Sequence, residues 1–263
     1  MKKFENKTVW ITGASAGIGE ALAHEFAKEG ARLVLSARNE AELQRVANAC
    51  GRPDTIVQPL DLGDHDSLPG VVQSVLAKAG SVDVLVNNGG ISQRSLAKDT
   101  KFDVDKKLVN VNLLGTIALT KAILPHFLER KAGHFVVITS LTGKFGTPLR
   151  SSYAAAKHGL HGFFDSLRAE VWRENVQVTL VCPGFISTKV SVNALTGDGS
   201  PQGSMDNKTR AGKSPEELAK AIVSAVKKGK YELHFGGSEL VGVYVKRFFP
   251  SLFTKLLRKA KVT

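Results

Sequence analysis

Short apolar runs recur along the chain and alternate with longer segments whose apolar residues repeat at helical spacing. The strongest runs cover residues 7–11, 33–37, 82–87, 135–139 and 176–182, and two weaker ones cover residues 55–60 and 231–235. Continuous apolar runs of this length are typical of strands buried on both faces, and helices are the usual connections between parallel strands. The pattern therefore predicts parallel strands joined by helical crossovers.

This alternation predicts an α/β fold: a single Rossmann-type, doubly wound domain with a parallel sheet of about seven strands and helices on both faces. The length of 263 residues and the hydrophobic content of 43% agree with one such domain and a sizeable core. Ligands of such sheets gather beyond the carboxyl ends of the strands. We expect this domain to cover residues 1–242, and a basic tail to cover residues 243–263.

A glycine-rich segment, Thr-Gly-Ala-Ser-Ala-Gly-Ile-Gly over residues 12–19, follows the first predicted strand and runs into a helical pattern. Gly13 would allow a tight turn, Gly17 would let the backbone approach a pyrophosphate, and Gly19 would permit close packing of the helix. The N-terminus of that helix offers free N–H donors and positive potential to a phosphate. The segment therefore predicts a dinucleotide site.

Tyr153 and Lys157 stand four residues apart in a helical pattern, which places both side chains on one helix face. An ammonium beside a phenol favours the phenolate, so the pair predicts a tyrosine that exchanges a proton with an alcohol or ketone. Ser140 directly follows a predicted strand and precedes this tyrosine. Taken singly, Ser140 as a strand end and Lys157 as a solvated helix charge are the simpler interpretations. Their occurrence together with the glycine segment favours a catalytic site.

These motifs make the chain similar to the short-chain dehydrogenase/reductase family over residues 5–240. The resemblance also includes Asn-Asn-Gly-Gly over residues 87–90, Asn112 in a Val-Asn-Leu-Leu-Gly segment, and Pro183-Gly184. The family usually has alanine where this chain has Gly89, and the missing methyl makes the turn more flexible, which bears on cofactor affinity. The resemblance implies an oxidoreductase that uses a nicotinamide cofactor and forms a homodimer or homotetramer through helix pairing.

The resemblance also implies a role for each motif residue. Tyr153 would exchange the hydroxyl proton while hydride passes between the nicotinamide and the same carbon centre. Ser140 would orient the carbonyl oxygen, and Lys157 would lower the pKa of Tyr153 and hold the nicotinamide ribose. Asn112 would support a water that relays protons from Lys157. The residues implied at the cofactor are Gly13, Ser15, Gly17, Ile18, Gly19, Arg38, Asp61, Leu62, Asn88, Gly89, Tyr153, Lys157, Pro183, Gly184, Ile186 and Thr188. Among them, Asp61 and Leu62 would lie against the adenine, Asn88 and Gly89 against its ribose, and Pro183 and Gly184 beside the nicotinamide.

The end of the second predicted strand indicates which nicotinamide cofactor is used. An acidic residue there would hydrogen-bond the ribose hydroxyls of NAD, whereas this chain has Ala37 followed by Arg38. A cation at this place suits a 2′-phosphate, so NADP(H) is favoured over NAD(H). The alternative is that Arg38 is a solvated loop residue near Glu40 and Glu42.

Residues 186–212 lose periodicity and are rich in Ser, Asn, Gly and Asp, which predicts a mobile loop that acts as a lid over the substrate. A helix is expected to restart at Ser214-Pro215, with Ser214 as its cap and Glu217 completing a capping box.

The tail carries half of the formal net charge of +12 and no acidic residue. Its cations are Lys246, Arg247, Lys255, Arg258, Lys259 and Lys261, and after Pro250 an apolar stripe is formed by Leu252, Phe253, Leu256, Leu257 and Ala260. This pattern is typical of a helix lying in an anionic membrane interface, and the tail is too short to span a bilayer. Packing of the stripe on the protein's own body, a partner subunit or the substrate opening is equally compatible. Together with Ala37-Arg38, the tail is similar to the membrane-associated branch near the hydroxysteroid dehydrogenases, which implies hydrophobic alcohols and ketones as substrates.

The two cysteines, Cys50 and Cys182, have no metal-ligand spacing, and no histidine motif of a metal site occurs, so we expect no metal. The amino end is too short for a signal peptide before the first strand, and no apolar run reaches membrane-spanning length. These features predict a cytoplasmic protein that is membrane-associated only if the tail binds lipid.

Two other classes of function compete with the enzyme. A redox-responsive scaffold would bind the cofactor with little turnover, but Ser140, Tyr153 and Lys157 argue against it. A nucleic-acid binder is suggested by the sequence pI near 9.7, but the excess charge is concentrated in the tail and no aromatic-basic motif occurs, so we expect no nucleic-acid partner.

Overall fold

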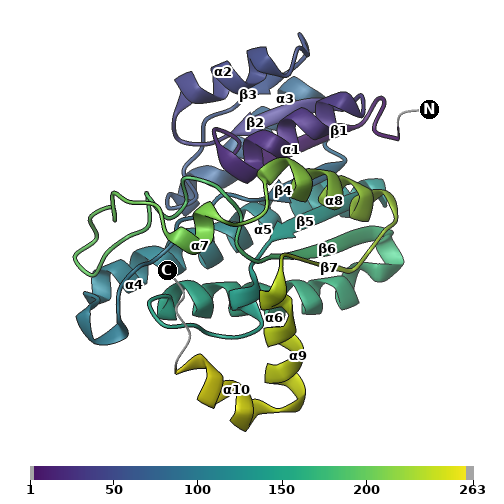
Figure 1. Ribbon diagram of the computed structural model, residues 1–263. Coiled ribbons are helices and arrows are strands. Elements are labelled where there is room, and N and C mark those ends of the chain that lie inside the picture. The colour runs from purple at the N-terminus through teal and green to yellow at the C-terminus, as the bar shows by residue number, and fades with distance from the viewer. Residues whose placement is uncertain (1–2, 259–263) are drawn as a thin grey trace.

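The computed structural model describes residues 3–258 of the chain. The tail residues Lys259, Ala260 and Lys261 lie outside the described residues, as do Met1 and Lys2. Seven strands form one sheet in the order β3-β2-β1-β4-β5-β6-β7, and all neighbouring strands are parallel (Figure 1). The strands are β1 Thr8–Thr12, β2 Arg32–Ser36, β3 Ile56–Val57, β4 Val84–Asn87, β5 Gly133–Ile138, β6 Val176–Pro183 and β7 Glu232–Phe235. The predicted fold class is confirmed.

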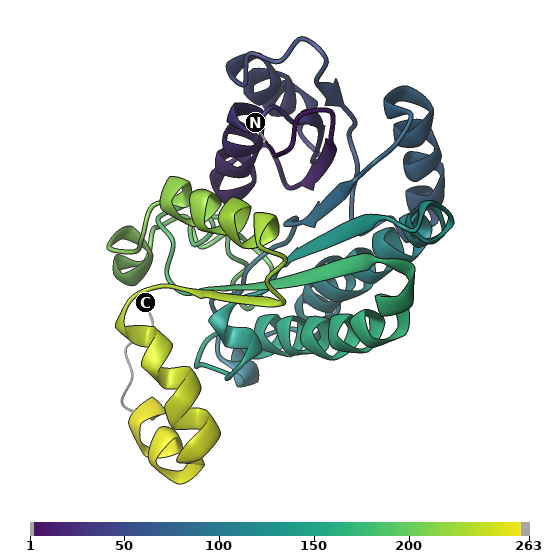
Figure 2. The ribbon, with the colours of Figure 1, turned by 90° about the vertical axis from the view of Figure 1, so that its right-hand side faces the viewer.

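Helices cover both faces of the sheet because their buried faces carry the apolar residues that the sequence spaced at helical intervals. The α-helices are α1 Gly17–Lys28, α2 Glu40–Ala49, α3 Leu68–Ala79, α4 Phe102–Val109, α5 Gly115–Arg130, α6 Ser151–Val171, α7 Asn207–Arg210, α8 Pro215–Lys227, α9 Val241–Phe248 and α10 Pro250–Leu257. Helices α1, α2 and α8 pack on one face, and α3, α5 and α6 pack on the other (Figure 2). The strand order reverses between β1 and β4, which opens a crevice at their carboxyl ends.

The predicted strand at residues 55–60 is shorter than expected, because β3 comprises Ile56–Val57 alone. It lies at the edge of the sheet and pairs with β2. The backbone N–H groups of Gln58 and Leu60 still donate to Leu35 and Ala37, while Pro59 between them has no N–H. The sheet therefore ends in a short, frayed edge.

The helical run from Phe102 to Arg130 contradicts the expectation that no segment reaches membrane-spanning length. By length and composition alone it could cross a bilayer. In the structure it comprises α4, a π-helical turn Asn110–Leu114 and α5, which contact α3, α6 and β5. Helices that pack in this way belong to the core of a folded domain. The segment Phe102–Arg130 is therefore only weak evidence for a membrane span.

The predicted substrate loop, residues 186–212, is folded against the body of the protein. Backbone bridges join Gln93 to Leu195, Ile186 to Lys213 and Leu195 to Pro201, and the loop contains α7. The next helix, α8, begins with the predicted capping box, in which Ser214 accepts from the Glu217 N–H. The loop thus has buried anchor points between its exposed turns.

The tail forms a hairpin of two short helices, α9 and α10, that projects from the body (Figure 2). Its stripe divides between two environments. Phe253 is buried against Phe145, with ring centroids 5.1 Å apart, whereas Leu252 and Leu256 are exposed. The stripe therefore packs partly on the protein's own body, one of the predicted alternatives.

Candidate active site

A cavity of about 1320 Å³ extends from the glycine segment after β1, past Tyr153, to the C-terminal hairpin. Of the residues expected to bind cofactor, those whose atoms line it are Gly13, Ser15, Gly17, Ile18, Arg38, Asp61, Leu62, Asn88, Gly89, Tyr153, Lys157, Pro183, Gly184, Ile186 and Thr188. Ser140 lines it too, whereas Gly19 and Asn112 are not among its lining residues. The sequence motifs are therefore brought together around one space.

The glycine segment forms a tight turn that a larger residue could not reproduce. Gly13 has a φ of +63°, and a Cβ added at Gly19 would come within 2.1 Å of the Gly13 carbonyl oxygen. The Asn88 amide braces this turn by donating to the carbonyl oxygens of Thr12 (2.9 Å) and Gly13 (3.2 Å). Asn88 thus has a structural role that the sequence did not indicate.

The N-terminus of α1 is available to an anion. No side chain of the described residues caps this helix, and its N-cap residue Ala16 lines the cavity together with Gly17 and Ile18. Uncapped N–H groups and the helix dipole together attract phosphate. The turn and the helix end therefore fit the pyrophosphate of a dinucleotide.

Gly89, where the family has alanine, lies against Leu62. A Cβ at this position would be 2.8 Å from Leu62 Cδ1, the end of a flexible side chain. Because Gly89 has no methyl group, the Leu62 side chain can occupy its position at the cavity wall. Alanine would require a small shift of Leu62 rather than of the backbone.

Arg38 is exposed at the edge of the cavity, just beyond β2. The Glu42 carboxylate, one of the two acids near it in sequence, pairs with Arg45 at 2.8 Å. Asp61, on the next strand connection, accepts from the Gly63 N–H at 2.8 Å and also lines the cavity. The Arg38 guanidinium is therefore placed to meet an anion that enters the cavity.

Tyr153 occupies the first turn of α6, which Gln93 holds in place. The Gln93 Oε1 atom accepts from the backbone N–H groups of Ser152 (3.0 Å) and Tyr153 (3.3 Å). Burial raises the pKa of the Tyr153 phenol, whereas a hydrogen bond from Ser140 and the charges of Arg150 and Arg94 oppose this rise. The phenol is thus a proton donor at neutral pH.

Lys157 lies one helical turn beyond Tyr153 in α6 and is anchored to the end of β5. Its Nζ donates to the Ile138 carbonyl oxygen at 2.8 Å and lies 5.7 Å from the centroid of the phenol ring. Burial lowers the pKa of Lys157 to about 8, because the charged form is poorly solvated there. The charges that oppose the rise in the Tyr153 pKa include those of Arg150 and Arg94, and the contribution of Lys157 stays a prediction.

Asn112 is fully buried in the π-helical turn between α4 and α5. Its Oδ1 accepts from the Ile91 N–H and its Nδ2 donates to the Ile91 carbonyl oxygen, each at 2.8 Å. Both ends of the amide thus brace the segment after β4. The role in proton relay stays a prediction.

Three charged residues that the sequence did not single out lie next to this site. Arg94, Arg150 and Asp206 form a buried cluster, and Arg94 and Arg150 line the cavity. Arg94 and Asp206 are 112 residues apart in the chain, Arg150 lies between them in sequence, and no local motif marks the three residues. The loop contains two acidic residues, Asp198 and Asp206, and the sequence does not indicate which of them is buried beside the arginines.

A second cluster outside the cavity joins Cys182, Glu232 and His234, whose potential ligand atoms lie within 4.8 Å of one another. Spacing in the sequence could not reveal it, because β6 and β7 bring the residues together. The Glu232 carboxylate already accepts from Lys144 at 2.9 Å and contacts His234. This internal pairing satisfies the carboxylate without a metal.

Comparison with known proteins gives one consistent result. A family description, short chain dehydrogenase, matches residues 7–198. The chain is 44% identical over 267 residues to a "Dehydrogenase/reductase SDR family protein 7-like" of Anopheles gambiae, covering 98% of this chain and 84% of that protein. Among solved structures, an alcohol dehydrogenase of Thermococcus sibiricus complexed with 5-hydroxy-NADP has a TM-score of 0.76 and 26% identity, covering 88% of this chain and 97% of that one. A short chain dehydrogenase/reductase of Burkholderia phymatum in complex with NAD has a TM-score of 0.85 over 100% of this chain and 98% of that one, and at 21% identity it supports the fold alone.

Proposed function

Because the chain belongs to the short-chain dehydrogenase/reductase family of oxidoreductases, we propose that it interconverts an apolar ketone or aldehyde and the corresponding alcohol, using NADP(H). The observation that carries this proposal is the continuity of one cavity. It joins a phosphate-binding glycine turn to Tyr153, Ser140 and Lys157, and then to apolar residues of the C-terminal hairpin. These hairpin residues are Val241, Val245, Phe253, Leu256 and Leu257.

Tyr153 is the proton donor in the direction of ketone reduction and the acceptor in the reverse direction. Ser140 lies within hydrogen-bonding reach of the phenol and orients the carbonyl oxygen beside it. Lys157 would hold the ribose hydroxyls of a bound cofactor. Asn112 braces the segment after β4 and supports the relay of protons from Lys157. A bound nicotinamide dinucleotide would supply or accept the hydride.

The enzyme assay that tests this proposal is NADPH consumption with a panel of steroid, retinoid, sugar and acyl ketones. The apolar cavity wall leads us to expect turnover of the apolar ketones above that of the sugars. A Tyr153→Phe sample provides the blank. Turnover of none of the ketones, with the cofactor bound, would instead favour a binding protein.

The preference for NADP(H) is proposed from Arg38. Replacement of Arg38 by alanine should weaken NADPH binding about tenfold to a hundredfold, because charge-assisted hydrogen bonds to a phosphate are lost. NADH binding should change little. Cofactor dissociation constants measured by fluorescence titration check this prediction, and Arg52→Ala, an arginine paired with Asp54 at 3.3 Å, is the matched control. An equal loss of affinity for NADPH and NADH would show that Arg38 attracts both cofactors by its charge and does not recognise the 2′-phosphate.

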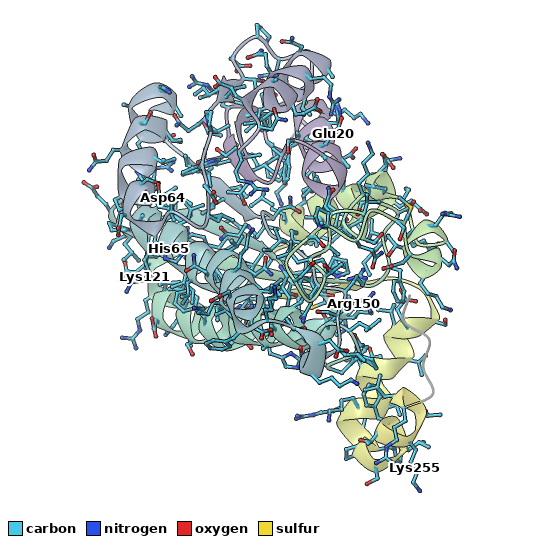
Figure 3. All side chains as sticks on the ribbon, turned by 90° about the vertical axis from the view of Figure 1, so that its left-hand side faces the viewer. Glu20, Asp64, His65, Lys121, Arg150 and Lys255 are labelled. Atoms are coloured by element: carbon cyan, nitrogen blue, oxygen red, sulfur yellow. The ribbon has the colours of Figure 1, made fainter. Side chains whose placement is uncertain are left out.

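We also propose that the hairpin docks on an anionic membrane surface, at which a hydrophobic substrate reaches the cavity. Phe248 is 68% exposed and Phe249 is 62% exposed, and Tyr244, Leu252 and Leu256 are exposed with them. The cations Lys246, Arg247, Lys255 and Arg258 surround this apolar surface, and residues 240–258 contain no acid. Lys255 lies at the outer end of the hairpin (Figure 3). Charge and exposed aromatic groups together suit a negatively charged bilayer.

Serine at Phe248, Phe249 and Leu252 should lower binding to anionic vesicles at least about tenfold, because the apolar contact with the bilayer is lost while buried Phe253 is kept. Co-sedimentation with anionic and neutral vesicles measures this. The control replaces Phe102 and Trp172, which are equally exposed on the body. Unchanged vesicle binding contradicts membrane docking. If the substitutions instead change the number of subunits in the protein, the exposed hairpin surface forms contacts between copies of the chain.

The family resemblance further supports a homodimer or homotetramer. We place the protein in the cytoplasm, at the membrane surface when the hairpin is docked.

A further inference from the structure

A buried ionic cluster ties the substrate loop to the segment that carries Tyr153. Asp206 belongs to the loop, and Arg94 follows β4. Arg150, which is labelled in Figure 3, directly precedes α6. The Asp206 Oδ2 atom lies 2.6 Å from both Nε and Nη2 of Arg94 and 3.6 Å from Nη2 of Arg150. The side chains of Arg94, Asp206 and Arg150 are 4%, 2% and 7% exposed. Ion pairs this deeply buried interact more strongly than pairs at the surface.

Further hydrogen bonds fix both sides of this contact. On the loop, the Asp206 N–H donates to Ser191 Oγ at 3.2 Å and its Oδ1 accepts from Gln202 at 2.9 Å. On the body, Arg94 donates to Ser92 Oγ at 2.9 Å. The backbone N–H of Arg94 also donates to the carbonyl oxygen of Leu195 in the loop at 2.8 Å. The loop therefore cannot leave the body without withdrawing the Asp206 carboxylate from Arg94.

The two arginines of this cluster line the same cavity as the reactive phenol. Tyr153 packs in an apolar group with Ile91, Val104, Leu108 and Leu195, and Leu195 belongs to the substrate loop. The positive charges of Arg150 and Arg94 act to lower the pKa of Tyr153. A carboxylate that pairs with both cations, as Asp206 does, would offset their field at the phenol.

We propose that Asp206 is a positioning residue through which docking of the substrate loop sets the proton affinity of Tyr153. With the loop docked, the carboxylate neutralises the cations and the phenol keeps its proton for transfer to a ketone. When the carboxylate is withdrawn, the cations favour the phenolate. Since such coupling is reciprocal, ionisation of the tyrosine also weakens docking of the loop.

The sign of the expected change depends on the charged groups around Tyr153 in the described part of the chain. Arg150 and Arg94 act on the phenol, and Lys157 Nζ lies 5.7 Å from the centroid of its ring. Asp206 pairs with both arginines, and Asp105 of α4 accepts from Ser152, the residue before the tyrosine. Neutralising Asp206 leaves the cations in place, so the phenol should lose its proton at lower pH. Neutralising Arg94 should have the opposite effect.

The test is a direct pH titration of the phenol, and it needs neither cofactor nor substrate. The chain has three tyrosines, and the other two, Tyr231 and Tyr244, are exposed. In a Tyr231→Phe, Tyr244→Phe background, the near-ultraviolet absorbance of tyrosinate therefore reports Tyr153 alone. The inference rests on the proposed function only for its catalytic meaning: failure of the proposed function would appear as full turnover of Tyr153→Phe, which leaves the titration unaffected.

In this background, Asp206→Asn should lower the titration midpoint by about one pH unit, the lower end of the effect of a nearby charge. Asp206→Glu should keep the titration midpoint close to that of the background protein, and Arg94→Gln should raise the midpoint. Asp198→Asn is the matched control, because Asp198 lies in the same loop but bonds to Thr196 and Ser200 instead of an arginine. An unchanged or raised midpoint in folded Asp206→Asn overturns the proposal. If circular dichroism shows that Asp206→Asn is unfolded, Arg94→Gln is the variant that tests the proposal. An unchanged titration midpoint in Arg94→Gln then overturns the proposal.

Discussion

Replacing Tyr153 by phenylalanine is expected to lower kcat by about a thousandfold while the NADPH dissociation constant stays within about twofold of the wild type. The change removes one hydroxyl and keeps the ring that packs against Val104 and Leu108. Proton transfer to the substrate oxygen is lost, whereas the glycine turn and the cavity near Arg38 are untouched. Single-turnover kinetics and cofactor fluorescence titration measure the two quantities separately.

Tyr231→Phe is the control for this experiment, since Tyr231 is exposed and lies outside the cavity lining. It should leave both quantities unchanged. Near-normal turnover of Tyr153→Phe would refute the assignment of the proton donor. A parallel loss of cofactor binding would show that the hydroxyl has a structural role instead.

Replacing Gly19 by alanine is expected to weaken NADPH binding at least about a hundredfold, the loss that a displacement of about an ångström can cause. The added Cβ would lie 2.1 Å from the Gly13 carbonyl oxygen and 2.7 Å from Asn88 Nδ2, so the turn and its brace must move apart. Such overpacking also costs about 1–3 kcal/mol of folding stability. Cofactor titration and thermal unfolding measure the two effects.

Gly162→Ala is the matched control, because this glycine lies in α6 and an added Cβ would meet no atom within 4 Å. It should bind cofactor normally and unfold at the same or a slightly higher temperature, since alanine is the better helix former. If Gly19→Ala binds NADPH as well as Gly162→Ala does, the glycine turn is not the cofactor site.

Much of the fold could be predicted because the relevant information is local. The buried strands are continuous apolar runs, and the helix that follows β1 carries its apolar residues at helical spacing. The capping box at Ser214 and Glu217 was predicted for the same reason, since all of its atoms lie within one helical turn. The edge strand β3 was overestimated, because the length of an edge strand depends on the neighbour that it pairs with.

The candidate site shows where local information ends. The spacing of Tyr153 and Lys157 predicted a shared helix face, but not that the Lys157 ammonium would bond to Ile138 on β5. The residues that act on the phenol charge, Arg94 and Arg150, could not be predicted, because they reach it from separate segments.

By itself, the sequence determined the α/β class, the glycine turn, the membership of the motif residues in one site, and the amphipathic character of the tail. These properties depend on the periodicity of apolar residues, on backbone freedom and on residue type, all of which can be read from the sequence. The tertiary structure alone decided that Phe253 packs inward while Leu252 stays exposed, that Asn88 braces the turn, and that Asp206 joins Arg94 and Arg150 beside Tyr153. The physical reason is that burial and charge pairing depend on distances through space, and chain folding brings together groups that are more than a hundred residues apart.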